Sequence, residues 1–320
     1  MRDLLGARLL VLTGKGGVGK TTMAAALALL GARRGLRTLV VEVGEQSRLS
    51  SMFGVRSAPS GSVVRLRDGV ESISIDPDLA LLEWLQALGG RVSGRLLASS
   101  GTFQYFTAAA PGAKELVSMV KISELVRARE RRRAGRGGDG HDLVILDAPA
   151  TGHALGMLRS PQTFGAIARV GPIVRQTDRV RELLADGERT AYVAVAMGSE
   201  MAVSETIELD AALREIVGRG LELVLANALL PRRFTPTELE LVDAASARLT
   251  AGGADEGERA LLLAAARAAR AAHVRAGAQH GQVARLRRRG FEVLGVPFQW
   301  TPRLDVEELE AIADQLERRV

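Results

Sequence analysis

Short apolar runs alternate with longer stretches rich in alanine and leucine along most of the chain. The runs are rich in Val and Leu and have the length of strands that are buried on both faces of a sheet. They lie at 9–12, 38–43, 142–146, 191–196, 221–226 and 293–298, with a hairpin-like stretch near 63–75. Stretches long enough for helices separate them, beginning with 22–34. This alternation predicts an α/β fold with a doubly wound, mainly parallel sheet.

The same pattern shows neither an internal repeat nor a boundary between two independent domains. We therefore expect residues 1–320 to form a single domain, since this length suffices for one large α/β unit. Two helical additions are expected within it: an insertion at about 77–140 and a segment at about 237–289.

The expected insertion carries two apolar bands that have two possible explanations. A helix start at Asp76 and Pro77 leads into the first band. In that band leucines recur every three residues from Leu79 to Leu88, and the second band lies at 116–126. Ordinary core packing explains both bands. The alternative is a groove for an amphipathic or membrane-bound client, but the insertion lacks the methionine-rich composition that favours such a groove.

Cysteine is absent, which excludes several kinds of site at once. A disulfide scaffold, a thiolate zinc site, an iron–sulfur cluster and a cysteine nucleophile all need this residue. The N-terminal segment has no long apolar core, and no apolar stretch reaches the roughly 18 residues of a membrane span. We therefore expect a cytoplasmic protein with neither a signal peptide nor a transmembrane helix.

The net charge of +6 raises the question of a nucleic-acid partner. Only 3% of the residues are aromatic, so few side chains are available to stack on single-stranded bases. The basic clusters at 127–136 and 285–289 have the composition of solvated helix faces and loops. An Ala- and Arg-rich composition explains the charge, and no specific nucleic-acid partner is expected.

One glycine-rich loop carries the clearest chemistry in the chain. It lies between the first apolar run and the first helical stretch, and it satisfies the pattern G-x-x-x-x-G-K-[ST]. Its residues are Gly14, Lys15, Gly16, Gly17, Val18, Gly19, Lys20, Thr21 and Thr22. Backbone N–H groups in such a loop turn toward phosphate oxygens, and the helix N-terminus adds a partial positive charge. The loop therefore predicts a nucleoside triphosphate site.

Four polar side chains have separate expected roles at this loop. Lys20 is expected to reach the β- and γ-phosphates, and the Thr21 hydroxyl to bind Mg²⁺. Thr22 is expected to bond the α-phosphate. Asp147 directly follows the apolar run at 142–146. A carboxylate at the end of a neighbouring strand suits a Mg²⁺ ligand that acts through water, and we expect Asp147 to have this role.

Lysine is rare in this chain, which makes a second lysine in the loop informative. It occurs only at Lys15, Lys20, Lys114 and Lys121, and arginine supplies the other basic side chains. The segment K-G-G-x-G-K-[ST]-T that begins at Lys15 resembles the deviant Walker A loop of the MinD/ParA, nitrogenase iron protein and ArsA-type ATPases. The resemblance implies that Lys15 reaches the nucleotide of a partner subunit and stabilises the leaving γ-phosphoryl group.

The segment that begins at Asp147 narrows the resemblance to one branch. The sequence D-A-P-A-T-G-H at 147–153 resembles the switch segment D-T-A-P-T-G-H of the ArsA/guided-entry ATPases. That family includes the arsenite-pump ATPase and the targeting factor for tail-anchored membrane proteins. The resemblance covers most of the chain. It implies ATP and Mg²⁺ as cofactors, a dimer, and a protein or membrane partner.

The same resemblance assigns an adenine site. Asn227 ends a strand-like run and resembles the adenine-reading asparagine of the family. Pro297 and Phe298 end the last run and resemble the residues that line the family's adenine pocket. Because ligands bind at the carboxyl ends of parallel strands, we expect the carboxyl-end residues Lys20, Asp147 and Asn227 to meet at one edge of the sheet.

Two departures from the family bear on activity. The switch I aspartate, which positions the attacking water in the family, corresponds to Gly44 here. Glu42 or Glu45 can substitute, since a longer carboxylate can still orient water, and Glu45 is our catalytic candidate. Either residue can equally be simple surface, so we expect hydrolysis to be slow or to need a partner. A stretch at 271–279 takes the place of the family's zinc-binding C-x-x-C, so neither zinc nor a thiolate arsenite site is expected.

These observations favour a Mg-ATP-binding dimeric ATPase that couples ATP binding and hydrolysis to a protein or membrane partner. The dimer is either a homodimer or a heterodimer with a related ATPase. The alternative, which Gly44 motivates, is a weakly catalytic nucleotide-binding module that forms half of such a heterodimer. A nucleic-acid partitioning ATPase is a third class, and the sequence supplies little in its favour.

Overall fold

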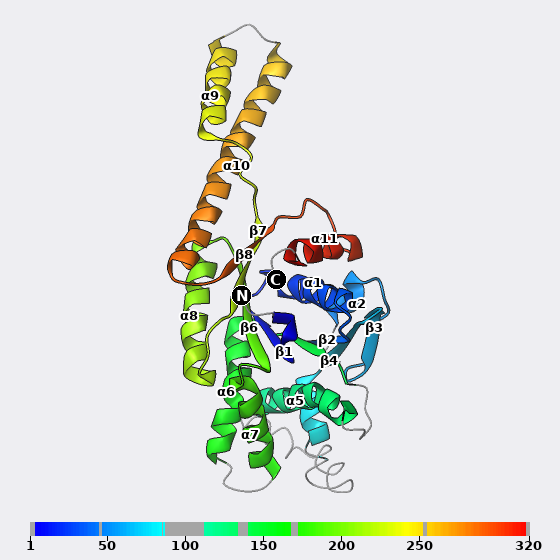
Figure 1. Ribbon diagram of the computed structural model, residues 1–320. Coiled ribbons are helices and arrows are strands. Elements are labelled where there is room, and N and C mark those ends of the chain that lie inside the picture. The colour runs from blue at the N-terminus through cyan, green and yellow to red at the C-terminus, as the bar shows by residue number, and fades with distance from the viewer. Residues whose placement is uncertain are drawn as a thin grey trace, which may run out of the picture.

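The computed structural model describes residues 4–44, 47–84, 86, 112–133, 140–167, 172–251 and 255–317. Its centre is an eight-stranded sheet in the order β3-β4-β2-β5-β1-β6-β7-β8 (Figure 1). Neighbouring strands in this sheet run parallel, except that β3 pairs antiparallel with β4. The doubly wound, mainly parallel α/β fold and the hairpin near 63–75 are thereby confirmed.

The strands correspond closely to the apolar runs. They are β1 (Leu9–Thr13), β2 (Thr38–Val43), β3 (Val63–Arg67), β4 (Val70–Ile75), β5 (Leu143–Asp147), β6 (Thr190–Met197), β7 (Leu223–Leu229) and β8 (Val293–Pro297). Every residue of β1 is buried, and so is every residue of β6 except Met197. Burial on both faces is the reason that these strands have continuous apolar sequences rather than alternating ones.

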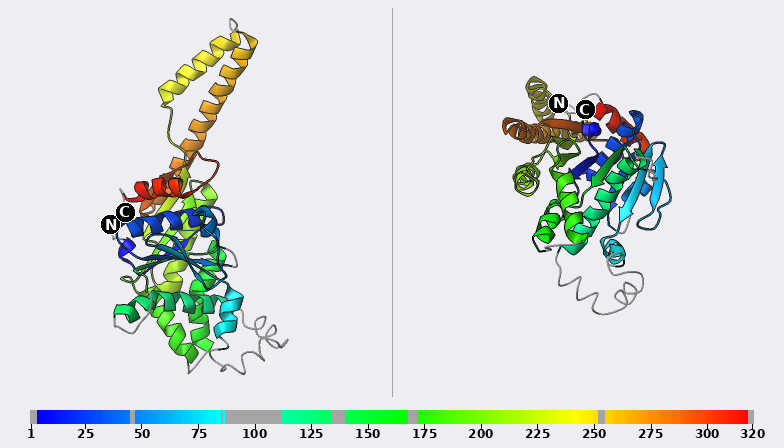
Figure 2. Two further views of the ribbon diagram at one scale, coloured as in Figure 1. Left: turned by 90° about the vertical axis from the view of Figure 1, so that its right-hand side faces the viewer. Right: turned by 60° about the horizontal axis from the view of Figure 1, so that its bottom comes forward.

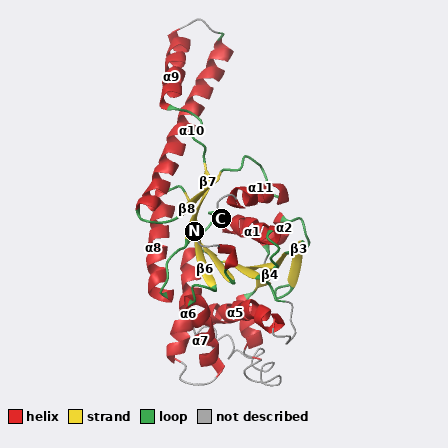
Figure 3. Ribbon diagram, viewed as in Figure 1, coloured by secondary structure: helices red, strands yellow, loops and turns green. Residues whose placement is uncertain are grey.

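Helices fill most of the chain between the strands (Figure 3). They are α1 (Lys20–Arg33), α2 (Arg48–Met52), α5 (Ala113–Arg133), α6 (Thr151–Ile167), α7 (Pro172–Ala185), α8 (Glu200–Val217), α9 (Pro236–Ala251), α10 (Glu256–Arg288) and α11 (Val306–Glu317), with a short 3₁₀ turn η1 (Leu4–Gly6). Residues 77–84 are helical as well.

Two layers of helices cover the sheet, one on each face (Figure 2). α1 and α11 belong to one layer, and α5, α6, α7 and α8 belong to the other. Side chains alternate along a strand, so Leu10 and Leu12 of β1 pack in the core with α1, whereas Leu9 and Val11 pack in the opposite core. The sheet is thus the shared wall of two hydrophobic cores.

The parallel register aligns chemically distinctive residues at one edge of the sheet. Leu12 of β1 lies beside Asp147 of β5, and Asp147 lies beside Glu42 of β2. Met197 of β6 lies beside Asn227 of β7. These positions are carboxyl ends of strands, which is the edge where ligands bind in folds of this kind.

The second apolar band of the expected insertion is part of a core. It lies in α5, whose Leu116, Met119 and Ile122 are buried. Leu79 of the first band is 48% exposed, whereas Leu81, which lies beside that band, is buried. Leu88 lies outside the described residues, as does most of the stretch to which the alternative of a client groove applies, so that alternative stays untested.

α9 and α10 form a long hairpin that projects from the sheet and its layers (Figures 1 and 2). α10 has 33 residues, which corresponds to about 50 Å of helix. Its buried residues, Ala276, Val283 and Leu286, all lie in its second half. Among the described helices, this hairpin included, none combines the length and the apolar character that a membrane crossing requires.

Truncation of Leu27 tests the packing behind the glycine loop. Leu27 lies on α1 and is completely buried in the core that α1 and α11 share with the sheet. We expect Leu27→Ala to lower the free energy of unfolding by about 2–5 kcal/mol, because the change leaves a cavity. Leu79→Ala removes the same atoms from a half-exposed side chain and should lower it by less than about 1 kcal/mol. Urea unfolding measures both values, and equal losses would contradict this assignment of the core.

Candidate functional site

The glycine loop joins β1 to α1 at the carboxyl edge of the sheet, and two of its positions require glycine. Gly14 has a φ of 144°, and a Cβ there would lie 2.2 Å from the Val195 carbonyl oxygen. Gly19 has a φ of 95°, and a Cβ there would lie 2.3 Å from the Asn227 side-chain nitrogen. The loop therefore lies tightly against β6 and β7. No side chain caps the first turn of α1, so its N–H groups stay available to a ligand.

Lys20 bends back over the loop that precedes it. Its Nζ donates to the carbonyl oxygens of Gly14, at 2.9 Å, and Lys15, at 3.0 Å. Burial lowers the pKa of the Lys20 amine, and the charge of Asp147 partly offsets this effect. The ammonium thus lies inside the loop on two neutral acceptors, which the oxygens of a bound anion can replace.

Thr21 and Asp147 form the closest polar contact of the site. The Thr21 hydroxyl donates to Asp147 Oδ2 at 2.6 Å, whereas the other carboxylate oxygen, Oδ1, is buried without a hydrogen-bond partner. Burial raises the pKa of Asp147 to about 6; the Thr21 hydrogen bond opposes this shift, and the charge of Glu42 adds to it. A buried carboxylate with one unpaired oxygen is an energetically costly arrangement that a cation would relieve.

The donors at this point suit a hard cation. The Thr21 hydroxyl and the Asp147 carboxylate are oxygen ligands of the kind that Mg²⁺ prefers. In the described ranges of the chain, no group of three or more His, Asp or Glu side chains is placed to hold a metal. A cation here would therefore take its remaining ligands from water and from a bound phosphate.

The other predicted loop residues have different surroundings. Gly16 and Gly17 are exposed at the tip of the loop, and Val18 is buried. Thr22 lies partly buried in the first turn of α1. The structure thus brings Lys20, Thr21 and Asp147 together, as the sequence predicts.

Lys15 is held by a helix of its own chain. Its Nζ lies 2.6 Å from Glu205 Oε1 and 2.7 Å from Met201 Sδ, and both of these residues belong to α8. The Lys15 and Glu205 side chains are 40% and 33% exposed, so water screens the ion pair in part. This contact is not predictable from the sequence, because the two residues are 190 positions apart and no local pattern connects them.

Asn227 bonds to the glycine loop and to its own backbone. Its Nδ2 donates to the Val18 carbonyl oxygen at 2.8 Å, and its Oδ1 accepts from the Ala228 N–H at 2.8 Å. Ala228 has a φ of 56°, a left-handed conformation that is unfavourable for a residue with a Cβ. The backbone turn at Ala228 therefore sets the direction of the Asn227 amide.

Gln279 of α10 holds this turn in place. Its Oε1 accepts from the Leu230 N–H at 2.8 Å, and its Nε2 donates to the Ala228 carbonyl oxygen at 3.3 Å. Gln279 belongs to the stretch at 271–279 that takes the place of the family's C-x-x-C, and its sequence position predicts no role for it. In the structure that stretch is continuous helix within α10, and Gln279 links it to the end of β7, the strand that carries Asn227.

Pro297 and Phe298 lie at the end of β8, next to the end of β7. Pro297 is in register with Leu229, and the Phe298 N–H donates to the Leu229 carbonyl oxygen at 2.9 Å. The Phe298 ring is 41% exposed and packs edge-on against Trp300 at 4.9 Å between centroids. An exposed aromatic pair therefore lies near the carboxyl edge, and no sequence motif identifies its second member, Trp300.

The switch I region follows β2, and the carboxylate of Glu42 near the end of that strand is fully hydrogen-bonded. Glu42 is buried, and its carboxylate accepts from Ser47 Oγ at 2.6 Å and from the N–H groups of Arg48 at 2.8 Å and Leu49 at 3.3 Å. Glu42 therefore caps the start of α2, and of its two predicted alternatives the one that makes it simple surface is wrong. Glu45, the catalytic candidate, lies outside the described residues.

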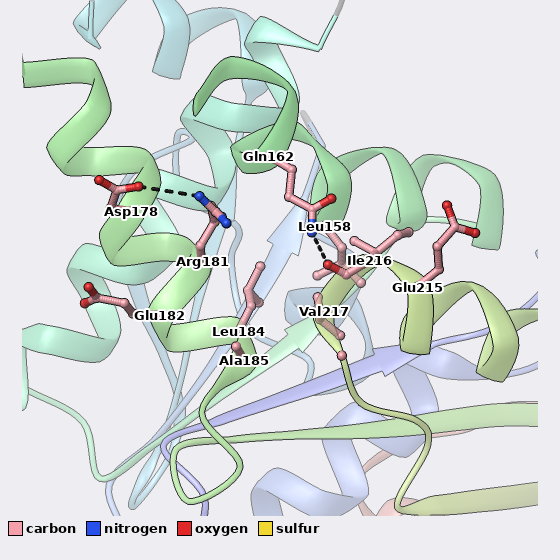
Figure 4. Close-up of a pocket in the computed structure, with 11 residues that line it drawn as sticks. Leu158, Gln162, Asp178, Arg181, Glu182, Leu184, Ala185, Glu215, Ile216 and Val217 are labelled. Atoms are coloured by element: carbon pink, nitrogen blue, oxygen red, sulfur yellow. Dashed lines mark hydrogen bonds and ion pairs between the residues drawn. The ribbon is translucent and has the colours of Figure 1, made fainter. Parts of the chain in front are cut away.

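A separate cavity lies away from the glycine loop (Figure 4). It has a volume of about 580 Å³ and lies among α6, α7 and the end of α8. Leu158, Leu184 and Ile216 line it, and an ion pair between Arg181 and Asp178, at 3.7 Å, borders it. None of its lining residues belongs to the loop or to the Asp147 edge, so it is not part of the candidate site.

Several known proteins that this chain resembles are ATPases, which agrees with the geometry of the loop. The family described as anion-transporting ATPase matches residues 7–170, about half of the chain. ATPase BagA of Mycobacterium tuberculosis is 33% identical over 266 residues, which cover 78% of this chain and 75% of its own. ATPase GET3 of Kluyveromyces lactis is 25% identical over 253 residues, 68% of this chain and 70% of its own. ATPase GET3C of Arabidopsis thaliana is 25% identical over 271 residues, with coverage of 69% and 67%.

The buried carboxyl of Asp147 should make stability depend on pH. The pKa of Asp147 rises from 3.8 to about 6 on folding, so protonation of this carboxyl stabilises the folded state. This contribution to the free energy of unfolding is complete below about pH 4 and is lost as the pH rises through 6. The change is on the order of 2–3 kcal/mol. We expect Asp147→Asn to remove this part of the pH dependence of urea unfolding. Asp68→Asn, on an exposed turn, is the control and should follow the wild type; a wild-type slope in the Asp147→Asn variant would refute the assignment.

Proposed function

The chain belongs to the anion-transporting ATPase family and is an ATP-binding ATPase of that family, and from this premise we propose that it binds Mg-ATP at the loop between β1 and α1 and hydrolyses it as a dimer. The observation that carries the proposal is the convergence of Lys20, Thr21 and Asp147 at the carboxyl edge. Asp147 has an unpaired buried oxygen there, which supports a cation site at this position.

In this proposal the loop residues bind and neutralise the phosphates. Lys20 exchanges its two carbonyl acceptors for phosphate oxygens, and the N–H groups of the loop and of the first turn of α1 bind the remaining oxygens. Thr21 and Asp147 would hold Mg²⁺, and Thr22 bonds the α-phosphate. When bound, the ion supplies positive charge against the phosphate oxygens.

In the proposed complex the adenine base lies on the side of the loop that faces β7 and β8, away from the Mg²⁺ site. Asn227 releases the Val18 carbonyl oxygen and reads the adenine edge with its amide. Pro297 and the exposed ring of Phe298 supply apolar surface for the base. Both groups lie at the ends of strands whose carboxyl ends share the edge of Asp147, which supports a single continuous nucleotide site.

Lys15 acts in the partner's site in this proposal. To reach the partner it must leave Glu205, and a partly exposed ion pair of this kind contributes only about 0–1 kcal/mol. The exchange is therefore energetically accessible. Positive charge from Lys15 stabilises the transferring phosphoryl group, as an arginine finger does in related chemistry.

The water-positioning acid distinguishes two versions of the function. Both oxygens of Glu42 are engaged at α2, which leaves Glu45 as the acid for hydrolysis by the chain alone. Gly44 motivates the second version, in which this chain is a weakly catalytic half of a heterodimer and a related ATPase supplies the acid. Turnover by the pure protein, compared with turnover after addition of such a relative, separates the two versions. In either version, the bound nucleotide controls a protein or membrane client. Neither version involves a specific nucleic acid or a thiolate site for arsenite.

The two loop lysines should have separable effects. We expect Lys20→Ala to abolish ATP binding, because it removes the charge that contacts the phosphates. Lys15→Ala should leave ATP affinity nearly unchanged and lower turnover by about 10³-fold, the range of a catalytic cation supplied by a partner. Lys121→Ala, on α5 and paired with Glu83, is the control for a lost surface lysine. Titration with a fluorescent ATP analogue and a phosphate-release assay measure the two effects, and an equal loss of binding in both variants would refute the role of Lys15.

Release of Lys15 should favour the dimer. We expect Glu205→Gln to strengthen ATP-dependent self-association by up to about fivefold, since it removes the acceptor that holds Lys15 within its own chain. Glu208→Gln, an exposed position on the same helix, should have no such effect. Sedimentation in the presence of Mg²⁺ and a non-hydrolysable ATP analogue measures the association, and a weaker dimer in the Glu205→Gln variant would show that Glu205 is needed in the dimer instead.

A further inference from the structure

The hairpin of α9 and α10 extends beyond the rest of the protein (Figures 1 and 2). We call residues 236–251 and 256–275 the arm. None of its described side chains is buried, and the first buried residue of α10 is Ala276. The arm therefore depends for its packing on the contact between its own two helices.

A single helix–helix contact leaves apolar surface of the arm uncovered. Leu239, Val242 and Leu249 form a helical stripe on α9, and each is only partly buried. Leu241 on α9 is 66% exposed, and Val274 on α10 is 63% exposed. Exposed apolar side chains on a projecting element offer a surface to a partner.

A groove of about 770 Å³ runs along the arm. α10 lines it from Leu263 to Ala278, and Ser246 contributes from α9. This part of α10 has the same number of residues as α9, 16, so each is about 24 Å long. The basic residues that line the groove are Arg267, Arg270 and Arg275. The groove thus suits one amphipathic helix of the length of α9 that carries negative charge.

Charge is divided between the two helices of the arm. α10 has no acidic residue between Arg259 and Arg289. α9 carries the acids Glu238, Glu240 and Asp243 and a single basic residue, Arg248. Arg270 already pairs with Asp243 of its own chain. The groove arginines left to a partner are therefore Arg267 and Arg275, and Glu240 lies next to the exposed Leu241 on α9.

We propose that the arm binds the arm of a second copy of this chain, with α9 of each copy in the α10 groove of the other. One arm carries both halves of such a contact: an acidic helix with an exposed leucine and a basic groove of matching length. Two hairpins that pair in this way form a four-helix bundle, in which every helix gains a second neighbour. The contact is self-complementary, as a twofold symmetric interface requires.

The arm contact is additional to the proposed nucleotide function. It needs no ATP, whereas the exchange of Lys15 between subunits does. By keeping two copies together, the arms raise the effective concentration at which the nucleotide sites meet. Loss of the arm contact should therefore weaken self-association without changing the affinity of a single chain for ATP.

Charge reversal on the two helices tests the proposal with the full chain. We expect the wild type to dimerise without nucleotide in sedimentation equilibrium. Glu240→Arg alone, and Arg267→Glu combined with Arg275→Glu, should each raise the dissociation constant about tenfold or more, because like charges then face each other. An equimolar mixture of the two variants should recover wild-type association, since each arm then meets its complement. Arg288→Glu, on α10 but outside the arm, is the control and should not change the association.

Several outcomes would overturn the pairing of arms. They are a wild type that stays monomeric, variants that associate like the wild type, and a mixture that fails to recover. If the arginine variant associates normally but no longer binds vesicles that contain phosphatidylglycerol, the groove serves an anionic membrane and the pairing is refuted. Affinity for a fluorescent ATP analogue is measured in parallel, so that failure of the nucleotide function is recognised separately.

Discussion

The parallel pairing of β1 with β5 is the constraint on which the candidate site depends. It places Leu12 beside Asp147, so the first turn of α1 meets a carboxylate from the neighbouring strand. The Thr21 hydroxyl donates a hydrogen bond to one oxygen of that carboxylate, and the other oxygen is buried without a hydrogen-bond partner. An uncompensated buried oxygen destabilises a fold, which gives a physical reason to expect a cation there. The burial and pairing of β1 and β5 thus determine the position of the candidate site.

Three contacts hold the loop in its present conformation, and each engages a group that the proposed function uses. Lys20 bonds to loop carbonyls, Lys15 pairs with Glu205, and Asn227 bonds to the Val18 carbonyl oxygen. These contacts satisfy donors that would otherwise lie unpaired, and each is weak enough to be exchanged. Nucleotide binding would replace the first and third directly. Phosphate recognition, base recognition and subunit contact are therefore expected to be linked through one short loop.

The fold and the phosphate end of the site were predictable from sequence, because they follow from local patterns. Apolar runs identify the strands, the parallel order brings their carboxyl ends to one edge, and a glycine loop before a helix has few alternative conformations. Contacts that depend on how distant helices pack were not predictable. The Lys15–Glu205 ion pair depends on the position of α8, and the hydrogen bond from Gln279 to the Ala228 carbonyl oxygen depends on the position of α10. The capping of α2 by Glu42 was also missed, because a carboxylate at the end of a strand can face either solvent or a helix N-terminus.

The dependence of ATP affinity on Mg²⁺ tests the central claim most directly. The measurement is a titration of the wild type and of Asp147→Asn with ATP, in the presence of chelator and over a series of free Mg²⁺ concentrations. We predict that Mg²⁺ tightens ATP binding to the wild type by about tenfold or more, and that Asp147→Asn loses most of this gain. An affinity that is independent of Mg²⁺ in the wild type, or an equal gain in both proteins, would contradict the account.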